Sequence, residues 1–238
     1  MQQRINKALY LWILVPSLAC NNAPSSEQSI LMSDTITEFE NVSAQLDTIR
    51  KQKLDYDTAY WIDIADFIPE IIHDIKYATN DNFTNKQIYD CPRCLLRKDS
   101  GKALKKAFET ARIAGYGMKV FDCYRPAPYQ QRLWDVMPDK RYVAPPAKGS
   151  MHSRGAAVDL TLIYSHNNEE VDMGTPYDYF GKEAHPAYRG LPDSTLQHRK
   201  LLTRCMTEAG FRPITSEWWH FDFGTSQARL ESFLWECE

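Results

Sequence analysis

A β-strand pattern that contains a carboxylate constrains the fold of this chain more than any other sequence feature. Val158, Leu160 and Leu162 alternate with polar residues, so the segment 157–164 is predicted to be a β-strand. Asp159 lies among these apolar residues, where it should be buried. A buried carboxylate is costly unless it has a partner, and a metal ion is a good one. The chain must therefore fold so that other polar groups converge on Asp159.

Two further segments supply side chains that could meet Asp159. His152 lies in a loop before the strand, and Gly155 between the two residues lets the chain turn. Near the C-terminus, Glu217 and His220 are separated by two tryptophans. Residues three apart on a flat strand face opposite ways, so Glu217 is predicted to lie at a bend or bulge.

His152, Asp159 and His220 form a predicted site for one zinc ion. Three protein ligands and one open position are typical of catalytic zinc, whereas structural sites are closed by four ligands. Glu217 is left over, and a free carboxylate beside a metal-activated water is what hydrolysis needs. Singly, each residue could be a hydrogen-bonded core histidine or a salt-bridged acid. The combination favours a metal-dependent hydrolase.

The remaining patterns predict a single α+β domain with a small, mainly antiparallel sheet flanked by helices. The chain has 238 residues and is 43% hydrophobic, so it can form one substantial packed core. Helical patterns cover 102–114, 126–137 and 196–209, and strand patterns cover 118–123, 157–164 and 218–223. Glycines follow the first and last of these helices, as is typical of helix C-termini.

The first residues are predicted to direct export. Arg4 and Lys7 precede the segment 8–19, which is apolar and uncharged but too short to span a membrane, so 1–19 is typical of a signal peptide. Ala19 and Cys20 end this segment as in bacterial lipoproteins, in which the cysteine is lipidated. Plain secretion and a retained anchor are the alternatives. We expect an exported protein of the periplasm or cell envelope.

The segment 20–55 is predicted to be a polar tether between the lipidated cysteine and the domain. It is rich in Ser, Asn, Gln, Asp and Glu, with room for a short helix over 39–49. The folded domain is predicted to occupy 56–238. The net charge of −3 gives no concentrated basic face for nucleic acid, so the expected partner is a small molecule, and a lipid anchor is the only expected membrane contact.

Five cysteines follow Cys20, and their number is odd, so at least one should lack a partner within the chain: Cys91, Cys94, Cys123, Cys205 and Cys237. Cys91 and Cys94 have the CxxC spacing of zinc or redox sites. A structural zinc site would need a second such pair, which the sequence lacks. We therefore expect structural cysteines or one disulfide, with the pairing open.

Several segments together resemble a known family. The segment 150–159 has the pattern Ser-x-His-x-x-Gly-x-Ala-x-Asp, and Glu-x-Trp-His follows about sixty residues later, as in the zinc D,D-peptidases that cut D-alanyl-D-alanine. The sequence Phe-Asp-Cys-Tyr-Arg-Pro at 121–126 resembles the Asp-x-Tyr-Arg-Pro signature of the D-alanyl-D-alanine dipeptidase branch known from vancomycin resistance. The segments 76–84 and 174–178 agree further, and the similarity spans 64–224.

The resemblance implies a fold of the zinc D,D-peptidase, or hedgehog-like, type with catalytic zinc in a cleft on the sheet. It implies that His152, Asp159 and His220 bind the zinc. It also implies that Glu217 is the general base and that Arg125 stabilises the oxyanion of the tetrahedral intermediate.

Two further residues match family positions that contact the dipeptide, Ser150 and Asp178, and Asp178 is the natural partner of a free substrate ammonium. Each of these roles has a structural alternative. Arg125 could merely pair with Asp122, and Asp178 could be an ordinary turn residue of its Gly-Thr-Pro loop. The other four histidines match no ligand spacing and are expected to be structural or exposed: His73, His166, His185 and His198.

The chain departs from the family pattern at Cys123, where a small residue such as Ala is usual, and we expect little effect. It departs further in its exported N-terminus, because the resistance-type enzymes act inside the cell. Outside the cytoplasm the same chemistry would salvage or trim peptides released from peptidoglycan.

Two rival functions remain at this point. One is a D,D-carboxypeptidase or endopeptidase on longer peptidoglycan stems, which Asp178 argues against. The other is a non-catalytic zinc-containing module that binds peptidoglycan, which would have no reason to keep Glu217 and Arg125 together. The sequence leaves the exact dipeptide and the oligomeric state open.

Overall fold

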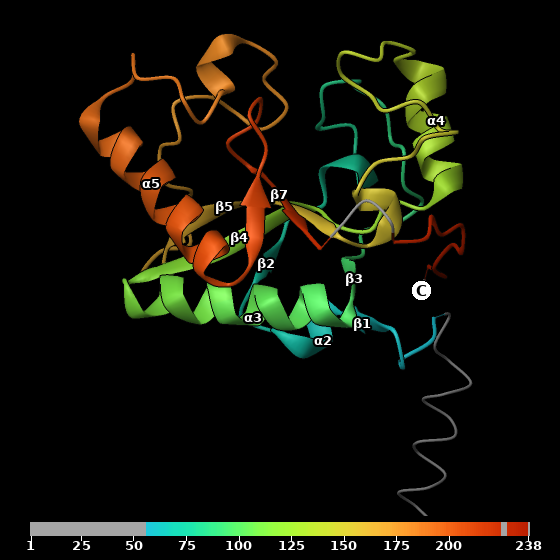
Figure 1. Ribbon diagram of the computed structural model, residues 1–238, viewed down its shortest axis with the longest axis horizontal. Helices are drawn as coiled ribbons and strands as arrows, with labels where there is room; N and C mark the ends of the chain where they lie inside the picture. The colour runs from blue at the N-terminus through green and yellow to red at the C-terminus, as the bar shows by residue number, and fades with distance from the viewer. Residues whose placement is uncertain (1–55, 225–227, 238) are drawn as a thin grey trace, which may run out of the picture. The chain divides into compact units, whose positions relative to one another are not determined.

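The computed structural model describes residues 56–224 and 228–237 (Figure 1). The predicted signal peptide, Cys20, the tether and the short helix over 39–49 lie outside the described residues. Within the described part of the chain, no helix combines the length and the apolar character that crossing a membrane requires.

A five-stranded sheet forms the centre of the domain, with the order β2-β4-β5-β7-β6. Its strands are β2 (Ile72–His73), β4 (Tyr116–Asp122), β5 (Ala157–Tyr164), β6 (Phe211–Pro213) and β7 (His220–Phe223). Only the β2–β4 pair is parallel, so the expected mainly antiparallel sheet is confirmed. The strands β1 (Trp61–Asp63) and β3 (Leu95–Arg97) form a separate antiparallel pair.

The register of this sheet brings polar residues of three strands side by side. Asp159 on β5 is paired with Asp122 at the end of β4 and with His220 at the start of β7. The register shifts between Val120 and Asp122, so the end of β4 is irregular. Segments that are far apart in the sequence therefore meet at one point of the sheet.

Helices flank the sheet as expected: α2 (Ile64–Phe67), α3 (Lys98–Ile113), α4 (Ala127–Val136) and α5 (Asp193–Glu208), with short 3₁₀-helices η1 (Lys76–Ala78), η2 (His152–Arg154) and η3 (Lys182–Ala184). Figure 1 shows α3 running along the sheet, where it packs against β4 and α5, while α4 lies apart from both helices. The apolar face of α3 is buried through Leu104, Ala107, Phe108 and Ala111.

The structure corrects where four predicted elements begin. The strand β4 begins at Tyr116 rather than at 118, and the helix α5 begins at Asp193 rather than at 196. The helix α3 begins at Lys98 rather than at 102 and so includes Gly101, which packs so closely on Ile62 that a Cβ there would lie 3.3 Å from that side chain. The last strand begins at His220 rather than at 218, because Trp218 and Trp219 lie in a bend.

Two disulfides join the described cysteines, one more than the sequence predicted. Cys91 is bonded to Cys237 and Cys94 to Cys123, while Cys205 is buried without a disulfide, which confirms the expected unpaired cysteine. The expectation that Cys123 changes little is wrong, because its side chain crosslinks the end of β4 to the residue before β3.

Candidate active site

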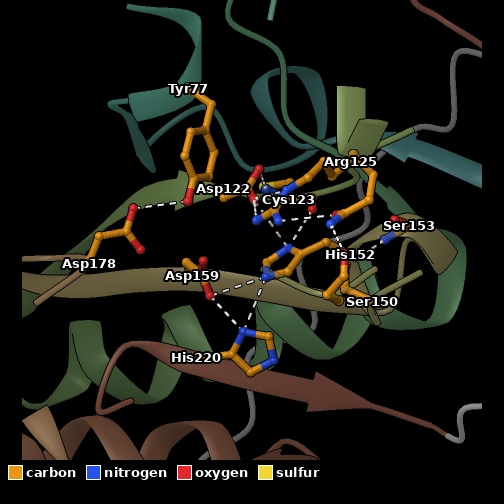
Figure 2. A network of polar contacts seen from close by, with 12 residues as sticks. Tyr77, Asp122, Cys123, Arg125, Ser150, His152, Ser153, Asp159, Asp178 and His220 are labelled. Atoms are coloured by element: carbon orange, nitrogen blue, oxygen red, sulfur yellow. Dashed lines mark hydrogen bonds and ion pairs between the residues drawn. The ribbon is translucent and has the colours of Figure 1, made fainter. Parts of the chain in front are cut away.

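Three predicted ligand side chains meet where β4 ends and β7 begins (Figure 2). His152 comes from η2, Asp159 from β5 and His220 from β7. The Nε2 atom of His152 lies 3.1 Å from Nδ1 of His220, and Oδ1 of Asp159 lies 3.3 Å and 2.9 Å from these two nitrogens. These residues form the group that could hold a metal ion in the described part of the chain.

The spacing of these atoms fits zinc. Tetrahedral zinc with bonds of about 2.0–2.2 Å separates its ligand atoms by about 3.4 Å. The three observed separations, 3.1, 3.3 and 2.9 Å, are close to this value. Two histidines and one carboxylate leave a fourth position open, as in catalytic sites.

Each ligand is oriented by a second contact. His152 donates from Nδ1 to the carbonyl oxygen of Cys123 at 2.7 Å, which leaves Nε2 free to bind a metal. His220 donates from Nε2 to Oδ1 of Asp222 at 2.9 Å, which turns Nδ1 towards the metal position. The hydroxyl of Tyr177 donates to Oδ2 of Asp159 at 3.0 Å, so Oδ1 faces the same position.

The electrostatics of the three ligands favour a positive charge at this point. Burial lowers the pKa of His220, but Asp159 and Asp222 outweigh it and raise that pKa to about 10. Burial raises the pKa of Asp159, but His152 and His220 outweigh it and hold the pKa below its usual range. The buried carboxylate of Asp159 therefore needs a positive charge beside it, and a metal ion supplies that charge when it displaces the protons of the histidines.

Gly155 allows the turn that brings His152 back to the strand. Its φ of 65° is in the left-handed region, where glycine carries no steric penalty. A Cβ at this position would lie 2.2 Å from the ring of Trp61. The predicted role of this glycine is confirmed, because both its conformation and its surroundings exclude a side chain.

Glu217 lies beside the metal position between two bends, at 215–216 and 218–219, so the irregular backbone that the spacing predicted before β7 is confirmed. Its Oε2 atom is 4.0 Å from Nδ1 of His220. Burial raises the pKa of Glu217 above its ordinary value. A carboxylate with a raised pKa beside a metal site is well suited to accept a proton from water.

Arg125 forms an ion pair with Asp122, through Nη2 and through Nε at 3.0 Å. This is the pairing expected if Arg125 has a structural role. It also donates from Nη1 to Gln130, and its guanidinium lies 4.9 Å from the ring centre of Tyr77. The side chain is only 7% exposed and nevertheless lines the cavity described below. The ion pair fixes the guanidinium in the site.

Asp178 lies on the opposite side of the metal ligands from Ser150 (Figure 2). Its Oδ2 atom accepts a hydrogen bond from the hydroxyl of Tyr77 at 2.9 Å. Burial raises the pKa of Asp178 well above its ordinary value, and repulsion from Asp159 adds to this. Asp178 has a positive φ of 55°, so it is also the turn residue that the alternative described.

The seven active-site residues proposed from the sequence all line one cavity of about 420 Å³: Arg125, Ser150, His152, Asp159, Asp178, Glu217 and His220. The four other histidines are absent from its lining. Sequence reasoning missed Tyr77, Tyr177 and Asp222. Asp222 could have been found, because it lies two residues after His220 and so shares its face of the strand.

A family model described as D-ala-D-ala dipeptidase matches residues 57–234. The chain belongs to this peptidase family. The D-alanyl-D-alanine dipeptidase of Escherichia coli (strain K12) is 42% identical over 166 residues, covering 70% of this chain and 86% of that protein. The D-alanyl-D-alanine dipeptidase of Enterococcus faecium is 35% identical over 182 residues, covering 65% and 89%. As a member of this dipeptidase family, the chain is a zinc metallopeptidase, which agrees with the ligand geometry above.

Solved structures are more distant. A structure described as VanYB in complex with D-Alanine-D-Alanine is 17% identical, with a TM-score of 0.38, and the match covers 57% of this chain and 75% of that one. A structure of the LdcB LD-carboxypeptidase is 20% identical, with a TM-score of 0.40 and coverage of 73% and 72%.

Proposed function

We propose that the protein hydrolyses D-alanyl-D-alanine or a closely related cell-wall-derived dipeptide. The observation that carries this proposal is the cavity, which is lined at once by a metal-binding trio, a free carboxylate, a buried arginine and a second acid. The family and the relatives at 42% and 35% identity name the same reaction.

The zinc would be held by His152, Asp159 and His220. When bound there, zinc lowers the pKa of a coordinated water to about 7 and polarises the scissile carbonyl. The hydrogen bonds to the carbonyl of Cys123 and to Asp222 keep both histidines in the tautomer that this binding needs.

Glu217 acts as the general base. Its carboxylate accepts the proton of the attacking water and passes it to the leaving amine. Arg125 donates to the oxyanion that develops on the carbonyl oxygen. Its ion pair with Asp122 supports this role, because a donor that is already fixed needs no reorganisation during the reaction.

The two ends of the substrate are recognised on opposite sides of the metal. Asp178 pairs with the free ammonium, and this contact would offset the burial and the repulsion from Asp159 that together raise the pKa of the carboxyl. Ser150 contacts the C-terminal residue from the far side of the cavity. A free dipeptide satisfies both contacts, whereas a longer stem would have no ammonium at Asp178.

The proposal is tested with purified protein and four substrates. D-Ala-D-Ala should be cut fastest, L-Ala-D-Ala more slowly, and N-acetyl-D-Ala-D-Ala and a pentapeptide stem slowest. Faster cleavage of the pentapeptide would support the carboxypeptidase or endopeptidase alternative. Zinc binding without hydrolysis of any of the four would support the non-catalytic module instead.

We further propose that the protein is exported and anchored by a lipid at Cys20, so that it acts in the periplasm or cell envelope. The charged start, the apolar segment 8–19 and the sequence Ala19-Cys20 support this location. The two disulfides of the described residues also support it, because disulfides persist in oxidising compartments. There the enzyme would salvage or trim dipeptides released from the wall.

A further inference from the structure

The carbonyl group that orients His152 belongs to a residue whose side chain is crosslinked. His152 donates from Nδ1 to the carbonyl of Cys123 at 2.7 Å (Figure 2). The sulfur of Cys123 is bonded to that of Cys94, and both residues are completely buried. One residue, Cys123, therefore carries both the disulfide and the carbonyl group that sets the tautomer of a proposed zinc ligand.

The sheet does not hold this carbonyl by itself. The strand β4 ends at Asp122, and the register shifts just before that residue. Beyond Asp122, two links tie the chain to the segment around β3. One is the disulfide to Cys94, and the other is the hydrogen bond from the amide of Tyr124 to the carbonyl of Leu95 at 2.9 Å.

The same residue also contacts the arginine side of the site. The amide of Cys123 donates to Oδ1 of Asp122 at 2.9 Å, and the other oxygen of this carboxylate pairs with Arg125. The amide of Arg125 in turn donates to the carbonyl of His152 at 3.1 Å. A displacement of Cys123 would thus disturb the positions of both His152, a proposed metal ligand, and Arg125, the proposed oxyanion donor.

We propose that the Cys94–Cys123 disulfide is a positioning element of the zinc site. It fixes the Cys123 carbonyl so that His152 presents Nε2 to the metal. The inference rests on the proposed zinc-ligand role of His152. Because both cysteines are buried, the crosslink acts as a fixed part of the folded protein, and it ties full metal affinity to folding in an oxidising compartment.

The second disulfide provides a matched control. Cys91–Cys237 also joins distant segments, but the carbonyl of Cys91 accepts a hydrogen bond from the indole of Trp235 and not from a zinc ligand. The variants Cys94→Ala/Cys123→Ala and Cys91→Ala/Cys237→Ala each remove one crosslink. Both should lower the melting temperature, and Cys91–Cys237 closes the longer loop, so a purely stabilising role would reduce zinc affinity at least as much in the control variant.

The experiment measures zinc affinity by competition with a chromogenic chelator on the parent and both variants. Peptide mapping without reductant must first find the Cys94–Cys123 link, and its absence would overturn the proposal. We expect zinc affinity to fall by about 10-fold to 100-fold in Cys94→Ala/Cys123→Ala, the range for losing a contact that orients a ligand. The control variant should remain within about twofold of the parent, well below that range.

Equal affinities in all three proteins would overturn the inference while leaving the proposed function intact. Failure of the parent to bind zinc would instead overturn the proposed function. If the double variant does not fold, Cys94→Ala alone removes the crosslink and keeps Cys123, and the same difference from Cys91→Ala is expected. The absorption spectrum of bound Co²⁺ gives a second readout, which should change only when the Cys94–Cys123 link is lost.

Discussion

The Nε2 atom of His220 lies 2.9 Å from Oδ1 of Asp222, two residues along the same strand. This contact uses the ring nitrogen that points away from the metal position. The other nitrogen, Nδ1, is thereby left to face Oδ1 of Asp159 at 2.9 Å. A carboxylate behind a metal-binding histidine fixes its tautomer and increases its basicity.

Replacing Asp222 should therefore weaken metal binding without removing a ligand. We expect Asp222→Ala to reduce zinc affinity by about 10-fold to 100-fold, because His220 loses the acceptor that orients it. Asp222→Asn keeps an acceptor oxygen and should have a smaller effect. Chelator competition measures both. An unchanged affinity in Asp222→Ala would show that the His220 tautomer is fixed by other groups.

Asp178 should determine how strongly the enzyme prefers a free amino terminus. In Asp178→Asn the charge partner of the ammonium is lost, which should cost about 2 kcal/mol or more in kcat/KM for D-Ala-D-Ala. The rate with N-acetyl-D-Ala-D-Ala should change much less, so the preference for the free dipeptide over the acetylated one should become smaller. Asp172→Asn, in the same loop but outside the cavity lining, is the matched control. A preference that survives in Asp178→Asn would contradict the assignment.

The activity should fall on the acid side at a pH above that of an ordinary glutamate. Glu217 must be unprotonated to accept a proton, and burial raises its pKa above the ordinary value of 4.5. Activity is thus present above this raised pKa and lost as the pH falls through it. The pH profile of kcat/KM measures this, with zinc content checked at each point. Full activity at pH 4.5 with zinc retained would disprove a raised pKa.

Cys20 should govern the location of the protein. If this residue is lipidated, the full-length protein should sediment with membranes, and Cys20→Ala should release it or block its processing. Several acyl chains anchor firmly whereas one is marginal, so the shift should be large. Fractionation with an antibody to the domain measures it. A parent protein found entirely in the soluble fraction would argue against the anchor and leave secretion open.

The sequence predicted the strand over 157–164 with its bounds, because alternation of apolar and polar residues is a local property that survives folding. It also predicted irregular backbone at Glu217 before the last strand, from the opposite facing of residues three apart. The start of α3 was missed, because Gly101 is a weak helix former that is retained here by its close packing on Ile62.

Contacts between distant segments were the least predictable part of the site. Cysteine spacing does not determine pairing, so the link between Cys94 and Cys123 and its position behind His152 appeared only in the structure. The two tyrosines that bond Asp159 and Asp178 were likewise missed, since a hydroxyl far away in the sequence carries no spacing pattern.

The central claim is that Asp159 is a zinc ligand whereas Glu217 is a general base, and one paired measurement tests it. Zinc content and steady-state kinetics are determined for the parent, Glu217→Ala and Asp159→Ala. Glu217→Ala should keep its zinc and its fold, while kcat falls by about 10²–10⁴ and KM changes little. Asp159→Ala should lose zinc, activity and some stability together. A Glu217→Ala variant that empties the site while Asp159→Ala stays metallated, or one that keeps nearly full activity, would contradict the proposed mechanism.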